Sequence, residues 1–150
     1  MLKHLRIISL AALLLLGLGA VFAQDGEAEE VEPDVTIRLT TAIGAFDQGA
    51  FAFIGLDGDM EGVDNPDITV KVGDVVRVIL VKDPADMMEH DFVIDEFGVQ
   101  SDVLPAMGEE GDEVSVTFTA TEAGEFEYYC SIIGHRDGGM YGNFIVEEAE

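Results

Sequence analysis

The sequence predicts an all-β protein, an antiparallel β-sandwich of about seven or eight short strands with Greek-key connections. From Val35 onward, short runs rich in β-branched and aromatic residues alternate with turns that contain Gly, Pro and Asp. No stretch in that part shows sustained helical periodicity with capping residues. Its length suits one domain with a modest core.

Seven strands can be placed in chain order. They are residues 35–40, 68–72 before a Gly73–Asp74 turn, 75–81, 90–94, 114–119, 126–130 and 141–146. The run 75–81 is apolar on both faces apart from Arg77, which is typical of a central strand. Residues 42–66 carry three phenylalanines among several glycines, and their pattern leaves open an irregular loop, an edge strand or both.

The N-terminal residues are predicted to lie outside the folded domain. A basic flank, an apolar stretch over residues 7–22 and the small residue Ala23 indicate a secretory signal peptide over residues 1–23. A retained membrane anchor is the alternative, because about 17 apolar residues is the lower limit for a span. Residues 24–34 are acidic and are predicted to form a disordered linker before a domain at 35–150. Export to the periplasm or to the extracellular face of the cytoplasmic membrane is therefore expected.

The chain is strongly acidic, with 7 Lys and Arg against 31 Asp and Glu and a formal net charge of −24. Removal of residues 1–23 would take away two of the 7 basic residues and no acidic residue. The remaining 127 of the 150 residues would have a formal net charge of −26. Such a charge repels nucleic acid and anionic membranes, so neither is expected as a partner. It indicates a surface adapted to high salt, electrostatic steering toward a basic partner, or both.

Beyond the predicted signal peptide, the chain has two histidines and one cysteine. Cys130, His135 and Met140 follow one another in the pattern Cys-x4-His-x4-Met, and His90 lies earlier in the chain. A single Cys cannot form an internal disulfide, which leaves an intermolecular disulfide, an inert buried thiol or a metal thiolate. A thiolate, two imidazoles and a weak axial thioether form a site that suits both Cu(I) and Cu(II). The pattern therefore predicts one copper ion bound by these four residues.

The residues around Cys130 and Met140 support this prediction. Alternation across Phe126, Tyr128 and Cys130 places the thiol on the same face as two aromatic side chains, at the end of a strand. The axial thioether could instead come from another methionine; the alternatives are Met87, Met88 and Met107. Met140 is preferred because it lies five residues after His135.

These segments resemble the cupredoxins, the type 1 blue-copper proteins that include plastocyanins, azurins, halocyanins and auracyanins. The resemblance covers roughly residues 65–146 and depends on residues 65–74, 89–94, 124–130 and 130–140. It implies a cupredoxin-like sandwich, with Cys130 as the strongly covalent ligand and His90 as a buried imidazole. It further implies His135 as the imidazole at the solvent edge and Met140 as the axial thioether.

The resemblance also implies a one-electron carrier rather than an enzyme. A multicopper oxidase or nitrite reductase would need further His ligands, and a dinuclear copper domain would need a second Cys. We expect a monomer whose partners are redox proteins, such as a basic c-type cytochrome or an oxidase domain that docks near His135. The docking patch would contain Ile132, Ile133, Gly134, Gly138, Gly139 and Tyr141. A copper chaperone or storage protein is the alternative, because the same ligands hold Cu(I), and membrane contact is expected only if the N-terminal segment is retained.

One residue departs from the family pattern. The residue after the first His ligand is commonly Asn in this family, and here it is Asp91. We expect its side chain to accept a hydrogen bond from the hydroxyl or backbone N–H of Ser131 and so to connect the two ligand-bearing segments. If Asp91 is ionised, its charge would stabilise oxidised copper and lower the reduction potential.

Overall fold

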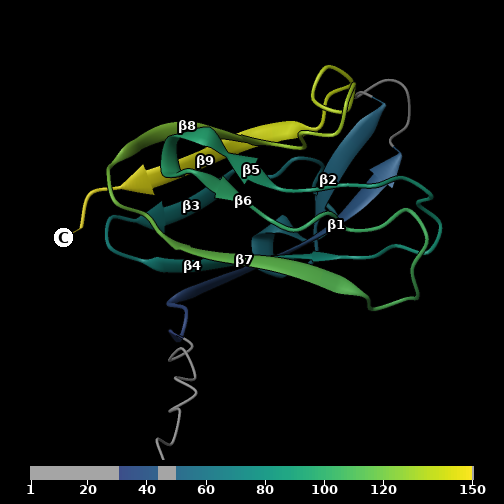
Figure 1. Ribbon diagram of the computed structural model, residues 1–150. Coiled ribbons are helices and arrows are strands. Elements are labelled where there is room, and N and C mark those ends of the chain that lie inside the picture. Colours follow the sequence, from purple (N-terminus) through teal and green to yellow (C-terminus); the bar gives the residue numbers. More distant parts are fainter. Residues whose placement is uncertain (1–30, 44–49, 150) are drawn as a thin grey trace, which may run out of the picture. The chain divides into compact units, whose positions relative to one another are not determined.

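The structure is a computed structural model that describes residues 31–43 and 50–149. In these residues nine strands form two sheets packed face to face (Figure 1). One sheet has the order β2 (Phe51–Gly55), β1 (Val35–Ile43), β4 (Val75–Val81), β7 (Glu113–Thr119). The other has the order β3 (Ile68–Lys71), β9 (Tyr141–Glu147), β8 (Gly124–Tyr129), β5 (Val93–Ile94), β6 (Val99–Gln100). The predicted β-sandwich is confirmed.

Helical structure in the described ranges is limited to two 3-10 turns, η1 (Gly58–Met60) and η2 (Asp95–Phe97). Neither is long or apolar enough to cross a membrane. The predicted signal peptide over residues 1–23, and residues 24–30 of the predicted linker, lie outside the described residues. Within the described part of that linker, Asp34 already pairs with β4, because its backbone N–H donates to Val75 O at 2.8 Å.

Alternation of side chains along the strands builds the core. In β1, Ile37 and Leu39 are buried while Arg38 between them is exposed. In β4, every second residue is buried, and the strand is central because it lies between β1 and β7. Full burial of an aliphatic side chain contributes about 1.5–3 kcal/mol, so these inward-facing rows dominate the stability of the sandwich.

Two features of the sheets differ from the purely antiparallel pairing expected from the sequence. β1 runs parallel to β4, with Ile37 opposite Val78, and β3 runs parallel to β9, with Ile68 opposite Phe144. A strand whose side chains alternate presents the same faces in either direction, so the pattern does not set its orientation. The segment left open at residues 42–66 contains β2, which is an edge strand paired with β1.

The loops that carry the predicted ligands meet at one end of the sandwich. In Figure 1, the yellow loop between β8 and β9 lies at the end opposite the C-terminus. An aromatic cluster fills the core; its ring centroids are 5.2 Å apart for Phe92 and Tyr128 and 5.4 Å apart for Phe53 and Tyr128. The buried Tyr128 hydroxyl donates to Pro66 O at 2.7 Å. Rigid, satisfied packing of this kind gives the loops a fixed base.

Candidate metal centre

The ligand loop, residues 130–140, leaves β8 and returns to the start of β9. Because these two strands are paired up to the loop, Cys130 and Met140 face each other at the strand ends, and Cys130 N donates to Met140 O at 3.2 Å. Within the loop, Met140 N donates to His135 O at 3.0 Å. Gly139 has a φ of 106°, a left-handed value that favours glycine. The loop thus brings three of the predicted ligands together through local contacts.

His90 reaches the site from the segment between β4 and β5. Its backbone forms an isolated bridge with Leu104, in which His90 N donates to Leu104 O at 3.1 Å and Leu104 N donates to His90 O at 2.7 Å. The strand predicted from residue 90 begins at Val93. This bridge fixes the backbone of His90 on the opposite side of the site from the ligand loop.

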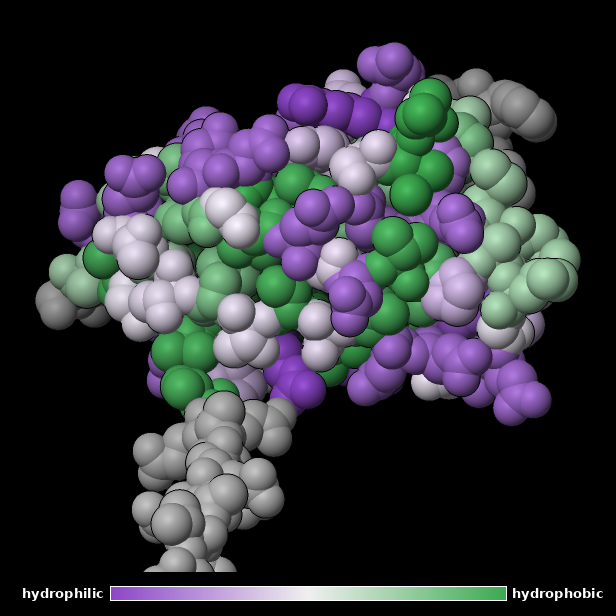
Figure 2. All heavy atoms as spheres, viewed as in Figure 1, coloured by the Kyte–Doolittle hydropathy of each residue, from purple (hydrophilic) through white to green (hydrophobic). Residues whose placement is uncertain are grey.

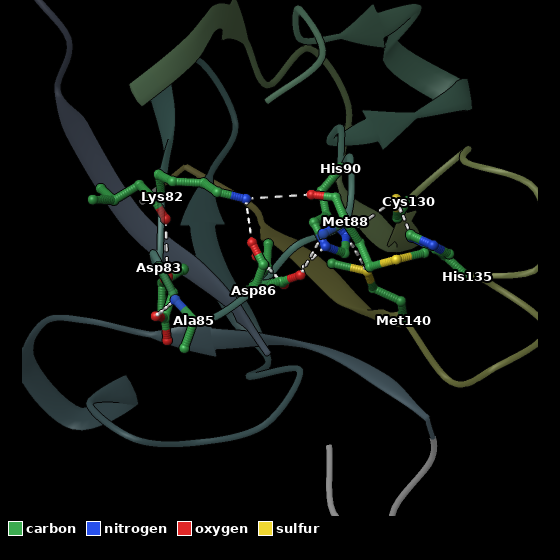
Figure 3. Close-up of polar contacts among 12 residues, drawn as sticks. Lys82, Asp83, Ala85, Asp86, Met88, His90, Cys130, His135 and Met140 are labelled. Carbon is green, nitrogen blue, oxygen red and sulfur yellow. Dashed lines mark hydrogen bonds and ion pairs between the residues drawn. The ribbon is translucent and has the colours of Figure 1, made fainter. Parts of the chain in front are cut away.

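The four side chains converge (Figure 3). Donor atoms of His90, Cys130 and His135 all lie within 4.8 Å of one another. Cys130 Sγ is 3.4 Å from His135 Nδ1 and 3.9 Å from His90 Nδ1, and Met140 Sδ is 3.2 Å from His90 Nδ1. All four side chains are buried, with at most 2% exposed. The structure therefore places together all four residues that the sequence singled out.

This donor set fits copper. Two imidazole nitrogens, a thiol sulfur and a thioether sulfur suit a copper ion that changes between Cu(I) and Cu(II). In the described residues the group contains no carboxylate, the usual ligand of calcium and magnesium. The other candidate methionines are more exposed, Met87 by 61%, Met88 by 37% and Met107 by 81%. Met140 is fully buried beside the imidazole of His90.

The chain matches the family model described as copper binding proteins, plastocyanin/azurin family, over residues 54–147. The protein belongs to this family of cupredoxins. The matched range includes all four converging residues. Copper is the metal that this family binds.

Solved structures with the same fold are similar to this cupredoxin. Auracyanin B matches with a TM-score of 0.56 and 20% identity, over 78% of this chain and 91% of its own. A rusticyanin variant matches with a TM-score of 0.51 and 20% identity, over 75% of this chain and 78% of its own. A copper-containing nitrite reductase from Thermus scotoductus SA-01 matches with a TM-score of 0.52 and 26% identity, over 77% of this chain and 27% of its own. The chain thus spans about a quarter of that reductase.

Burial controls the protonation of the cupredoxin site. Burial raises the pKa of the Cys130 thiol to about 11, although hydrogen bonds from the backbone of Asp91 and Ile132 oppose the rise. Burial lowers the pKa of His90 and His135, and the carboxylate of Asp86 opposes that shift in both. At neutral pH the metal-free site therefore holds two neutral imidazoles and a protonated thiol.

The expected connection through Asp91 is present, and it uses both groups of Ser131. Asp91 Oδ1 accepts from Ser131 N at 2.7 Å, and Oδ2 accepts from Ser131 Oγ at 2.5 Å and from Gln100 Nε2 at 3.0 Å. Burial by itself would raise the pKa of Asp91, but the hydrogen bonds from Ser131 and Gln100 outweigh it and lower the pKa. Asp91 is thus an ionised, fully buried carboxylate that joins the His90 and Cys130 segments.

Phe51 is a site residue that the sequence did not indicate. Its ring stacks on His135, with the ring centroids 4.1 Å apart and an interplanar angle of 21°. Only 2% of His135 is exposed, so its imidazole lies beneath the surface and not at the solvent edge that the family resemblance implied. The backbone of Phe51 also donates to Gly138 O at 3.3 Å, which attaches β2 to the ligand loop.

Asn65 reinforces this attachment. Its Oδ1 accepts from Phe53 N at 3.0 Å, and its Nδ2 donates to Gly139 O at 2.9 Å. Its φ is 45°, a left-handed value that Asn tolerates better than most residues. The segment before β3 is therefore part of the frame of the metal centre.

Proposed function

We propose that this cupredoxin is an exported one-electron carrier that binds a single copper ion through His90, Cys130, His135 and Met140. The observation that carries the proposal is the convergence of these four buried donors in a member of the plastocyanin/azurin family. Copper would supply reversible one-electron chemistry there, because a thiolate, two imidazoles and a thioether accommodate both of its oxidation states. The N-terminal signal pattern supports export.

The fold fixes the positions of the four ligand residues. Cys130 and Met140 are fixed by the ends of β8 and β9, His90 by its bridge to Leu104, and His135 by its stack on Phe51. Four protein ligands leave no position for a substrate, which favours electron transfer over catalysis at the metal. In the described ranges, His and Cys donors form one such cluster, which gives no support to a second copper centre.

An apolar surface beside the ligand loop supports docking of a redox partner. Ile133 is 99% exposed and Tyr141 is 49% exposed, whereas Ile132 is partly buried against the core. Figure 2 shows hydrophobic residues exposed at the end of the sandwich that holds this loop, with hydrophilic residues next to them. Exposed apolar patches of this kind mark binding sites, and nearby acidic residues would attract a basic partner such as a c-type cytochrome.

The function is tested by loading the protein with copper and titrating its redox state. We expect one reversible one-electron transition and electron exchange with a basic c-type cytochrome. Ile133→Ser should slow that exchange by about five-fold without moving the potential, as expected for loss of about 1 kcal/mol at a docking contact. Val31→Ser removes another exposed apolar side chain, before β1, and serves as the control. Binding of Cu(I) without reversible oxidation would instead identify a copper chaperone or storage protein.

A further inference from the structure

A cluster of buried polar side chains lies behind His90, outside the predicted ligand set. Its members are Thr41 on β1, Lys82 just after β4, and Asp86 in the segment that leads to His90; each is at most 3% exposed. Burying charged groups is costly unless they are paired or hydrogen-bonded, so this placement requires a compensating role. None of these three residues belongs to the ligand loop or to the docking surface.

The contacts of Asp86 identify it as the centre of the cluster. Thr41 Oγ1 donates to Asp86 Oδ2 at 2.7 Å, and Met88 N donates to Asp86 Oδ1 at 2.9 Å. Lys82 Nζ donates to the backbone carbonyl of Asp86 at 2.5 Å. Both carboxylate oxygens therefore act as acceptors, and a basic side chain lies beside them. These contacts hold the carboxylate in one orientation.

That orientation directs the carboxylate at His90. Asp86 Oδ2 lies 2.9 Å from His90 Nε2, while His90 Nδ1 faces Met140 Sδ and Cys130 Sγ (Figure 3). This contact falls outside the geometry of a well-formed hydrogen bond, and among the described groups Nε2 has no hydrogen-bond partner. Asp86 is thus the polar contact of the ring nitrogen that points away from the site.

We propose that Asp86 is a positioning residue for the copper centre, which keeps the proton of His90 on Nε2 and leaves the Nδ1 lone pair available to the metal. The inference depends on the proposed assignment of His90 as a ligand. A carboxylate on the outer nitrogen of a ligating histidine fixes its tautomer and ring orientation and raises its basicity as a ligand. The negative charge also favours oxidised over reduced copper, so Asp86 would lower the reduction potential.

Asp86 also anchors its own segment through Met88 and Lys82, so a purely structural role must be separated from an effect on the imidazole. Asp86→Ala removes both the charge and the acceptor. Asp86→Asn keeps one oxygen for His90, although this turns the amide N–H2 toward the N–H of Met88 and lowers stability. Glu89→Gln is the matched control, because it removes one negative charge from an exposed residue adjacent to His90.

Nitrogen-15 NMR of the metal-free protein reads the His90 tautomer directly, and competition titrations read copper affinity. We expect the wild type, Asp86→Asn and Glu89→Gln to keep the proton on Nε2, and Asp86→Ala to lose that preference. Cu(II) affinity should fall by about 10- to 100-fold in Asp86→Ala. Where Cu(II) affinity falls more than Cu(I) affinity, the potential rises by about 59 mV for each tenfold difference. Asp86→Asn should also raise the potential, and Glu89→Gln should not.

An Asp86→Ala protein with the wild-type tautomer and wild-type copper affinity would overturn the inference. If Asp86→Ala does not fold, Asp86→Asn provides the test, because it removes the charge and keeps an oxygen acceptor for His90; an unchanged potential in Asp86→Asn would also overturn the inference. A wild-type protein that binds no copper would instead overturn the proposed function itself, so the two failures are distinguishable.

Discussion

The thiol of Cys130 is fully buried, and burial raises its pKa to about 11. Burial lowers the pKa of His90 and of His135, so both imidazoles are already neutral at neutral pH and bind a metal without releasing a proton. Copper binding requires a thiolate, and we therefore predict that copper uptake at neutral pH releases one proton, from Cys130. Apparent copper affinity should rise about tenfold per pH unit up to the thiol pKa. Calorimetry in buffers of different ionisation enthalpy counts the proton, and a count of zero would contradict this prediction.

The carboxylate of Asp91 is fully buried next to the Cys130 segment. Asp91→Asn keeps an acceptor for Ser131 N and a donor for Ser131 Oγ, so the connection between segments should survive while the charge is lost. We expect the reduction potential to rise, on the order of 59 mV for a tenfold change in preference between oxidation states. Voltammetry of the two proteins measures the shift, and an unchanged or lowered potential would show that the charge of Asp91 does not tune the metal.

The sequence predicted some of these residues and could not predict others, for a physical reason. Cys130, His135 and Met140 have a recognisable spacing because one loop carries them all. Phe51 and Asp86 contact the site from other segments. Periodicity and spacing in the sequence do not indicate which distant parts of the chain are in contact, so neither residue could be predicted. In the sequence, the only local signal for Asp86 is its position four residues before a predicted His ligand.

At the scale of elements, the ligand loop and β2 are packed too closely for a larger residue at Gly138. A Cβ atom there would lie 2.7 Å from Phe51 Cδ2 and 3.0 Å from Gly134 O. We predict that Gly138→Ala displaces Phe51 from His135 and costs about 1–3 kcal/mol in the free energy of unfolding. Denaturant unfolding measures the cost, and the NMR shifts of the His135 ring protons report the loss of the stacked phenylalanine.

Gly134→Ala is the matched control within the same loop. Its φ of 86° strains any other residue, but no atom lies within 4 Å of the added Cβ. The expected cost is about 1–2 kcal/mol of backbone strain, with the Phe51–His135 stack unchanged. Equal changes in the His135 proton shifts in both variants would show that the stack does not depend on packing at Gly138.

The strand patterns in the sequence predicted the position of most strands but not their pairing direction. Alternation and turn residues located β1, β3, β4, β7, β8 and β9 to within a few residues. They did not specify that β1 and β4 are parallel, because pairing direction depends on how the chain crosses between the sheets. The strand predicted at residues 90–94 is shortened to β5, which keeps only its last two residues. β6 was not predicted, because two residues are too few for alternation to be recognised, and it forms by pairing with β5.

For the whole molecule, the net charge of −24 is the dominant property. If that charge steers a basic partner, the rate of electron exchange with a basic c-type cytochrome should fall as salt increases from about 0.01 M to about 1 M, where the Debye length shortens from about 30 Å to about 3 Å. Stopped-flow measurements follow the rate. A rate independent of salt, together with a free energy of unfolding that rises strongly with salt, would instead attribute the acidity to adaptation to high salt.

The central claim is that His90, Cys130, His135 and Met140 together form one type 1 copper site in this cupredoxin. The most direct measurement is a titration of the metal-free protein with Cu(II), followed by visible absorption. We expect an intense blue or green thiolate-to-copper band that saturates at one equivalent and is absent in Cys130→Ser. Cu(II) binding without this band, or a band of equal intensity in Cys130→Ser, would contradict the central claim.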